Sequence, residues 1–396
     1  MPQFNSKEFN PQAFGLYVDR VPNTKKNALA KSRAIGTNRQ ARHALSNQSG
    51  QVYGVIPYYG LIDPKTSQNN TGGADIQATT TTTYKQGFVV ARRMDGFTEV
   101  SFADSIVPGA NFMDNVAQQI SEYKIGVKQN ILLSMLKGIF AMATTGSTVR
   151  AKAAKEFINK HTTDITDAFG VTPEAANKAI QKACGDNKST FKIAIMDSTV
   201  ATDLENQKLL KFLTQTDANG IEVPLTLATW NGRLVIIDDD MPTEVVETTY
   251  KKTADKEIVV GKRYFILEDD EYIEVATPVV DDINDYYEID VEGHTKHTTY
   301  LVGENVIVLD DIGDAHPYEM YRDPKKNGGE DTLYIRDGYI CGFNAPISFV
   351  ANNSVTTSAS NADLENGANW EVVNDGKTAV STKAIAIARL ISKSLN

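Results

Sequence analysis

The chain has 396 residues, of which 41% are hydrophobic and 23% are charged, with a formal net charge of −10. This composition excludes an intrinsically disordered chain, and the absence of any run of about 18 apolar residues predicts no membrane-spanning helix. Cys184 and Cys341 are the only cysteines, too few for a disulfide scaffold or a four-cysteine zinc site. The sequence therefore predicts a protein of two to three domains that stays in the cytoplasm.

Charge is unevenly distributed along the chain. Residues 1–50 hold eight Lys or Arg against Glu8 and Asp19, a net charge of +6, whereas residues 231–340 hold 27 Asp or Glu against 11 Lys or Arg, a net charge of −16. This asymmetry indicates electrostatic complementarity with another copy, or a basic arm that faces nucleic acid without sequence specificity. The alternative interpretation is a solvated tail and a solvated acidic face.

The first hundred residues predict an extended arm followed by a β-rich loop. Residues 1–50 have few apolar anchors, and strand character begins at Val52. The runs 88–94 and 97–102 flank Asp95-Gly96, a dipeptide typical of a two-residue hairpin, so a projecting β-loop is expected here. Arg92 and Arg93, just before this turn, fall on opposite faces of the strand.

A long amphipathic helix is the strongest local signal. Apolar residues recur at spacings of 4, 4, 3, 4 and 4, which is the helical period. The pattern predicts a helix over residues 112–142, roughly 46 Å long at 1.5 Å per residue, with Asn111 as its cap. The apolar positions that carry it are Phe112, Val116, Ile120, Tyr123, Val127 and Ile131.

The middle of the chain has an α+β pattern. Thr172 as N-cap and Gly185 as stop predict a helix over 173–184. A strand is expected at 191–196, and a third helix from Ser198 through Leu213.

Later residues are expected to be mainly β. Asn231-Gly232 predicts a second two-residue hairpin. Short runs divided by acidic turns predict an all-β insertion over 243–310, and strands return over 317–350 around a turn at 325–329. The tail has a short helix near 362–366 and an apolar run over 384–391.

Catalytic, cofactor and metal signatures are absent. Gly376-Lys377-Thr378 is similar to the end of a phosphate loop, but Glu371 occupies the place of its first glycine, so we interpret it as a turn. His294 and His297 have a helical metal-ligand spacing, but their surroundings favour strand and turn. We therefore predict no enzyme activity, no cofactor and no metal site.

The order of the predicted elements resembles that of the major capsid proteins of tailed bacteriophages, which have the Hong Kong 97-type fold. This order is a basic arm, a long β-loop, a very long helix, an α+β body, a β-insertion and a returning strand pair. The resemblance covers most of the chain, and it is carried by the order and type of the predicted elements. The segments that carry it are 96–100 leading to 112, 318–324 leading to 331–336, and 361–364 with 369–371.

The resemblance implies an α+β fold with an N-arm, an extended β-loop, a spine helix, peripheral and axial domains, and a β-rich insertion. The implied divisions are the N-terminal arm (1–50), the extended β-loop (51–105), the peripheral domain (106–190) with the spine helix (112–142), the axial domain (191–242), the acidic insertion (243–310), the return to the peripheral domain (311–350) and the C-terminal segment (351–396).

The implied function is a structural protein of the virion, assembled in the bacterial cytoplasm. Hexamers and pentamers would form an icosahedral shell around double-stranded DNA, contacted nonspecifically, with a separate scaffolding protein, a portal and decoration proteins as further partners. We hypothesise that Arg92 and Arg93 pair with acidic groups of an adjacent subunit. The residues expected at the subunit interface are Arg92, Arg93, Asp95, Gly96 and Phe97.

Three alternatives remain open at the level of sequence. The first is a tail or other structural virion protein, against which the long central helix argues. The second is an encapsulin-type nanocompartment with the same fold, against which the basic arm argues. The third, an enzyme, has the weakest support.

Overall fold

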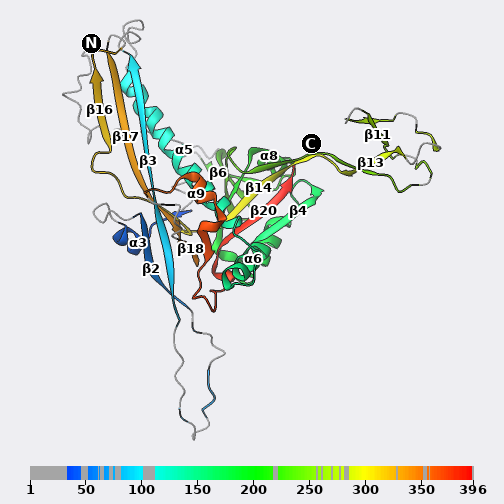
Figure 1. The fold of residues 1–396 in the computed structure, drawn as a ribbon, viewed down its shortest axis with the longest axis horizontal. Helices are drawn as coiled ribbons and strands as arrows, with labels where there is room; N and C mark the ends of the chain where they lie inside the picture. Colours follow the sequence, from blue (N-terminus) through cyan, green and yellow to red (C-terminus); the bar gives the residue numbers. More distant parts are fainter. Residues whose placement is uncertain are drawn as a thin grey trace.

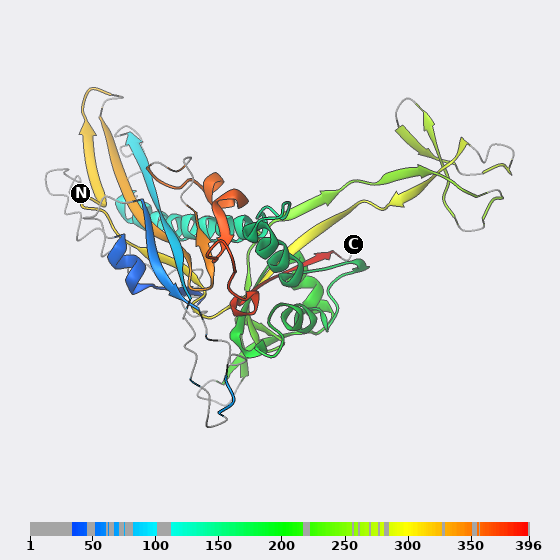
Figure 2. The same cartoon turned by 60° about the horizontal axis from the view of Figure 1, so that its bottom comes forward.

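The protein is an elongated α+β structure in which two sheets share a central helix and a third, small sheet stands apart at the end of a stalk (Figures 1 and 2). The computed structural model describes residues 34–45, 52–60, 62, 67–70, 75, 82–100, 112–216, 222–255, 257–259, 262–268, 271–275, 278–280, 285–326, 329–350, 355 and 357–394. Within these residues no helix is both long and apolar enough to cross a membrane.

The first sheet draws its strands from both ends of the chain. Its order is β1-β15-β17-β3-β2, and β16 pairs with the far half of β17. Its strands are β1 (Ile35–Gly36), β2 (Tyr53–Tyr59), β3 (Thr83–Val100), β15 (Ile307–Asp311), β16 (Tyr318–Asp323) and β17 (Glu330–Phe343). β16 and β17 pair antiparallel on either side of the turn expected at 325–329, so the prediction of a returning strand pair is confirmed.

The hairpin expected at Asp95-Gly96 is wrong. β3 is one continuous strand, in which Asp95 pairs with Ile335 and Gly96 with Tyr334 of β17. The turn preference of an Asp-Gly pair is local, whereas the antiparallel ladder with β17 runs from Val89 to Val100 and outweighs it. At its other end β3 pairs antiparallel with β2.

Helix α5 (Phe112–Phe140) confirms the predicted long helix and ends two residues earlier than expected. Its predicted cap, Asn111, lies outside the described residues. At 1.5 Å per residue the helix is about 44 Å long. The helix runs along the first sheet and reaches the second (Figure 2). Lys124 pairs with Asp337 of β17 at 3.0 Å, and Phe140 stacks on Tyr300 of the second sheet. One helix therefore holds both sheets in a fixed relation.

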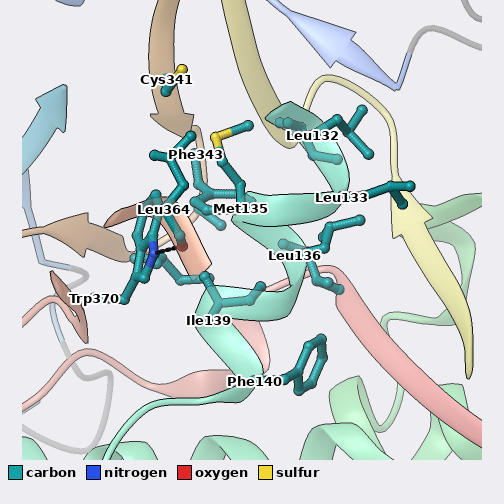
Figure 3. Packing of buried hydrophobic residues seen from close by; sticks show 14 of the residues in the cluster. Leu132, Leu133, Met135, Leu136, Ile139, Phe140, Cys341, Phe343, Leu364 and Trp370 are labelled. Carbon is teal, nitrogen blue, oxygen red and sulfur yellow. Dashed lines mark hydrogen bonds between the residues drawn. The ribbon is translucent and has the colours of Figure 1, made fainter. Parts of the chain in front are cut away.

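The last turns of α5 lie in the main hydrophobic core (Figure 3). Trp370 packs edge-on against Phe343 and Phe349, and its Nε1 donates to the carbonyl oxygen of Leu364 at 2.7 Å. Leu364 belongs to α9 (Asn361–Glu365), the short helix expected in the tail. A Cβ at Gly138 of α5 would lie 1.9 Å from this same carbonyl oxygen, so only glycine allows the two helices to approach so closely.

The second sheet has the order β4-β20-β14-β5-β8-β7-β6, with β9 paired to the outer end of β14. Its strands are β4 (Thr162–Phe169), β5 (Phe191–Met196), β6 (Leu210–Thr216), β7 (Glu222–Trp230), β8 (Arg233–Ile237), β9 (Thr243–Val246), β14 (His294–Gly303) and β20 (Ile387–Lys393). The helices α6 (Val149–His161), α7 (Ala175–Cys184) and α8 (Ser198–Asn206) accompany it. Two further strands, β18 (Ile347–Phe349) and β19 (Trp370–Val372), pair with each other, and the helix α3 (Arg39–Ala44) contacts β2.

Several predictions for this region are confirmed. β5 has the predicted bounds, and Asn231 and Gly232 form the predicted turn between β7 and β8 with φ of 50° and 77°. The stop of α7 at Gly185 is also as expected, but the helix begins at Ala175, and its N-cap position is Glu174 rather than Thr172.

The third helix is shorter than predicted. α8 begins after its cap Asp197 but ends at Asn206, and residues predicted as its last turns form β6. Lys208 adopts a left-handed φ of 59°, which an α-helix cannot accommodate. The apolar spacing of this stretch suits a helix, but pairing with β7 provides a sheet partner that local spacing does not reveal.

Residues 243–310, expected as one insertion, divide among three sheets. β9 and the first residues of β14 form a two-stranded stalk, and the small sheet at its end has the order β10-β13-β11-β12 (Figure 2). Its strands are β10 (Thr249–Lys252), β11 (Phe265–Glu268), β12 (Glu271–Glu274) and β13 (Tyr287–Val291). The inner half of β14 is buried in the second sheet, and β15 belongs to the first, because acidity marks the surface turns rather than the sheet to which a strand belongs.

Candidate assembly surface

The described residues contain no group of three or more His, Cys, Asp or Glu side chains placed to hold a metal ion. His294 and His297 lie on the strand β14, where a spacing of three places them on opposite faces. Burial raises the pKa of the Cys184 thiol to about 11 and that of the Cys341 thiol to about 12, so both are protonated at neutral pH. Gly376, with φ of 83°, lies in a tight turn in which Asp375 accepts from the amide of Thr378.

The surface that best fits an interface lies on the part of the first sheet that extends away from the second sheet. We call β16, β17 and residues 92–100 of β3 the blade (Figure 1). Strand periodicity divides the blade into two faces, one beneath α5 and one on the opposite side. The five residues predicted for an interface all lie on β3, and this alternation separates them.

Arg93, Asp95 and Phe97 lie on the face that α5 covers. The Arg93 guanidinium donates to the carbonyl oxygen of Ala359 at 2.9 Å and to Asn361 Oδ1 at 2.7 Å. The Phe97 ring meets the Tyr123 ring edge-on, with centroids 5.6 Å apart. Arg93 and Phe97 therefore make contacts within the chain, to the segment that leads into α9 and to α5.

An ionic network reinforces the covered face. Lys124 of α5 lies 3.0 Å from Asp337 Oδ1 and 2.5 Å from the Tyr318 hydroxyl. Burial lowers the pKa of Lys124, but Asp337 and Tyr318 outweigh it, so the net shift is upward and the ammonium stays charged. The ion pair between Lys128 and Asp311, at 2.7 Å, continues the same contact toward β15.

A cavity of about 350 Å³ opens between α5, β3 and α9, beside Arg93 and Gly126. Arg93, its only charged lining residue, already donates to Ala359 and Asn361. The one charged side chain that lines the cavity is therefore engaged within the chain.

The opposite face of the blade carries exposed apolar side chains. Met94 is 82% exposed, Tyr321 58% and Tyr334 41%. The ladder registers place Tyr334 opposite Gly96, and Tyr321 opposite Thr332, on the same side as Met94 and Arg92. We call this surface the outer face. It is made by Arg92, Met94, Gly96, Tyr321 and Tyr334, together with the salt-bridged pair Glu319 and Arg336, which lie opposite Tyr334 and Met94. The exposure of Met94 and Tyr321, each more than half exposed, shows that these side chains are open to solvent in the subunit.

Arg92 and Gly96 are thus brought together on the outer face, and the sequence interpretation missed its apolar members. The Tyr334 ring lies beside Gly96, and a Cβ at that position would only touch it, at 3.4 Å. Met94, Tyr321 and Tyr334 could have been found from the alternation in β3, β16 and β17 once the strands were correctly paired. The wrong hairpin concealed this alternation.

Comparison with solved structures finds similar chains in structures from phages. The chain is similar to a chain of the cyanophage Pam1 capsid asymmetric unit, with 10% sequence identity and a TM-score of 0.46. The match covers 100% of this chain and 96% of that one. It is also similar to a chain of the capsid of Ralstonia phage GP4 (9% identity, TM-score 0.46, 100% and 96%). A third match is a structure from Mycobacterium phage Bobi (10% identity, TM-score 0.42, 94% and 93%).

No family model and no curated protein matches the chain. Sequence identities of 9–10% and TM-scores below 0.5 give no residue-by-residue correspondence with the phage structures. The function proposed below therefore rests on the geometry of this chain and on the resemblance in its sequence.

Proposed function

We propose that the chain is the major capsid protein of a tailed bacteriophage and self-assembles into hexamers and pentamers of an icosahedral shell around double-stranded DNA. The observation that carries the proposal is the outer face of the blade. Met and Tyr side chains are enriched at protein interfaces, and Arg is the charged residue most often found among them. The outer face presents such side chains on a part of the molecule that extends from the body.

The overall shape supports the same proposal. The blade and the stalk extend from the second sheet in different directions (Figure 2), so each offers surface that the subunit itself does not bury. A closed assembly of identical subunits can bury such surfaces on its neighbours.

Within this proposal the contacts suggest how the chain is divided. The first sheet with α5 corresponds to the peripheral domain, and the second sheet to the axial domain. Residues 149–184, first assigned to the peripheral domain, form α6, β4 and α7, and β4 pairs with β20 of the second sheet. We therefore place these three elements with the axial domain.

The remaining partners follow from the same proposal. The virion is the site of action, and the packaged DNA would meet the basic residues 1–50 without sequence specificity. A separate scaffolding protein, a portal and decoration proteins complete the expected set. We assign the chain no catalytic role.

Sedimentation velocity tests the role of the outer face. Replacing Met94 and Tyr334 together by Glu places two charges in the proposed contact, so we expect only slowly sedimenting subunits where the wild-type chain forms rings or shells. The matched control is Lys155→Glu on the exposed face of α6, which we expect to assemble like the wild type. Normal assembly of the Met94→Glu/Tyr334→Glu variant would exclude the outer face as an interface.

A further inference from the structure

His297 lies where the stalk joins the second sheet, on the strand β14 that runs through both (Figure 1). Residues 294–297 of β14 pair with β9 of the stalk, and residues 300–303 pair with β5 of the body. His297 pairs with Thr243, the first residue of β9, and is only 6% exposed. A change in the charge of this side chain would therefore act at the joint between the stalk and the body.

The buried nitrogen of His297 lies beside a carboxylate. Nδ1 is buried without a hydrogen-bond partner, and it lies 3.6 Å from Asp197 Oδ1. This distance is too long for a hydrogen bond but within the range of an ion pair. Asp197 follows β5, and its Oδ1 accepts from the Thr199 amide at 2.7 Å as the N-cap of α8. The pair thus links β14 to the first turn of α8.

The other side chains around His297 offer Nδ1 no partner. Ser392 of β20 lies directly opposite His297 in the ladder, and Thr299 lies two residues further along β14 on the same side of the sheet. The hydroxyls of both are buried and also without a hydrogen bond. In the part of the chain that the structure describes, Asp197 has the only carboxylate within 4.0 Å of the His297 ring nitrogens.

Other charged groups near the joint point elsewhere. Side chains alternate along strands, so the charged neighbours of His297 in β14, β9 and β20 lie on the opposite face of the sheet. Asp238, which follows β8, accepts from the Gln129 side chain of α5. The N-terminal end of α8 favours a negative charge at Asp197, its cap. The charged residues on the opposite face are Lys296, Glu244 and Lys393.

We propose that His297 and Asp197 form a pH-sensitive clasp between the stalk and the body. Histidine is the side chain that ordinarily gains a proton between pH 8 and 5. Both ring nitrogens of a protonated imidazole carry hydrogen, so Nδ1 then donates to the Asp197 carboxylate in a charge-assisted hydrogen bond. Loss of the proton removes the attraction between the two charges. The clasp holds the stalk to α8 in mild acid and releases it near neutral pH, whether or not the chain assembles.

Hydrogen exchange of the dilute full-length protein at pH 5.5 and 7.5 tests the clasp. Each amide rate in residues 243–246 and 294–297 is divided by the intrinsic chemical rate at that pH, so that only the change in protection remains. We expect about tenfold greater protection of these residues at pH 5.5, because a hydrogen bond between charged groups then closes the joint. Amides of β5, in the body, should show no comparable gain.

Two conservative variants distinguish the clasp from other effects of acid. His297→Gln cannot gain the charge, and Asp197→Asn removes the carboxylate but keeps a side chain that caps α8. Both should lose the greater protection at pH 5.5. The matched control is His294→Gln, because His294 lies on the opposite face of β14, where its Nδ1 lies 2.7 Å from the Glu292 carbonyl oxygen. This control should behave like the wild type.

The protection of β5 also reports whether each variant is folded. Equal pH effects in the wild type, His297→Gln and Asp197→Asn would overturn the proposal, because the protection would then come from other groups. A wild-type protein whose stalk is protected equally at both pH values would also overturn it. Loss of the pH effect in His294→Gln alone would assign the clasp to the wrong histidine.

Discussion

At the residue scale, two glycines of α5 have opposite roles. Gly138 lies where α5 meets α9, and an added Cβ would lie 1.9 Å from the Leu364 carbonyl oxygen and 2.5 Å from Trp370 Nε1. Gly126 lies in the middle of the same helix, and nothing lies within 4 Å of a Cβ there. The same substitution therefore has a different physical consequence at each position.

Gly138→Ala should lower the free energy of unfolding by about 1–3 kcal/mol or more, since the backbone of α9 must move to admit the methyl group. Gly126→Ala, the matched control, should raise it by about 0.5–1 kcal/mol, because alanine favours the helix and has room. Urea unfolding followed by circular dichroism measures both. Equal effects of the two substitutions would contradict the close packing of α5 on α9.

Buried His161 makes the protein sensitive to acid. Its Nδ1 lies 2.7 Å from the Ile387 carbonyl oxygen, and its ring packs against Phe157. Burial lowers the pKa of His161 to about 4. The unfolded chain, with a pKa of about 6.5, binds the proton more readily, so the free energy of unfolding falls as the pH drops from 6.5 toward 4.

The expected loss from His161 alone is about 2 kcal/mol at pH 5 relative to pH 7. His161→Gln retains a donor for the Ile387 carbonyl and cannot titrate, so its stability should fall less steeply over this interval. Denaturant unfolding at pH 7, 6 and 5 compares the slopes, with exposed His316→Gln as control. A slope in His161→Gln as steep as that of the wild type would show that other groups cause the acid sensitivity.

At the element scale, the sequence predicts those elements whose signals are local. The apolar spacing of α5, the bounds of β5 and the turn at Asn231-Gly232 are set by neighbouring residues, and the structure confirms them. The turn at Asp95-Gly96 and the long third helix are wrong, because each is overruled by a strand that pairs from elsewhere in the chain. Strands that form by pairing with distant parts of the chain cannot be predicted from local sequence patterns alone.

The candidate site follows the same rule. Arg92 and Gly96 lie on the outer face, but Arg93, Asp95 and Phe97 face α5, because a continuous β3 alternates its side chains between two environments. Assigning all five to an interface required them to flank a turn. The exposed partners Tyr321 and Tyr334 come from β16 and β17, more than 200 residues away, and could be found only after the ladder was known.

The two arginines of β3 therefore should respond differently to replacement. Arg92→Glu changes an exposed side chain on the outer face, so we expect a folded subunit with impaired assembly. Arg93→Glu removes donors to Ala359 and Asn361 and should destabilise the subunit itself, by about 1–3 kcal/mol. Thermal unfolding and sedimentation of each single variant separate the two effects.

Replacing Arg92 and Arg93 together would combine the effect on assembly with the effect on subunit stability. The single variants are therefore the better experiment. Normal assembly of Arg92→Glu would remove Arg92 from the proposed contact. Unchanged thermal stability of Arg93→Glu would contradict its role in joining β3 to α9.

At the scale of the whole molecule, a central helix joins two sheets, and two extensions leave the body in different directions (Figure 2). α5 is fixed to the first sheet by Lys124 and Lys128 and to the second by the packing of Phe140 on Tyr300. Such a subunit has its two sheets joined at its centre by one helix, and its two extensions offer surface at its ends. This arrangement suits a building unit whose ends are completed by neighbouring copies.

Electron microscopy of the purified protein, expressed alone and then with the neighbouring genes of its source, tests this account most directly. Tubes of stacked rings would indicate a tail protein, and closed shells that enclose an enzyme would indicate a nanocompartment. We predict closed shells, or regular rings of five and six subunits. Uniformly monomeric particles in both preparations would contradict the account.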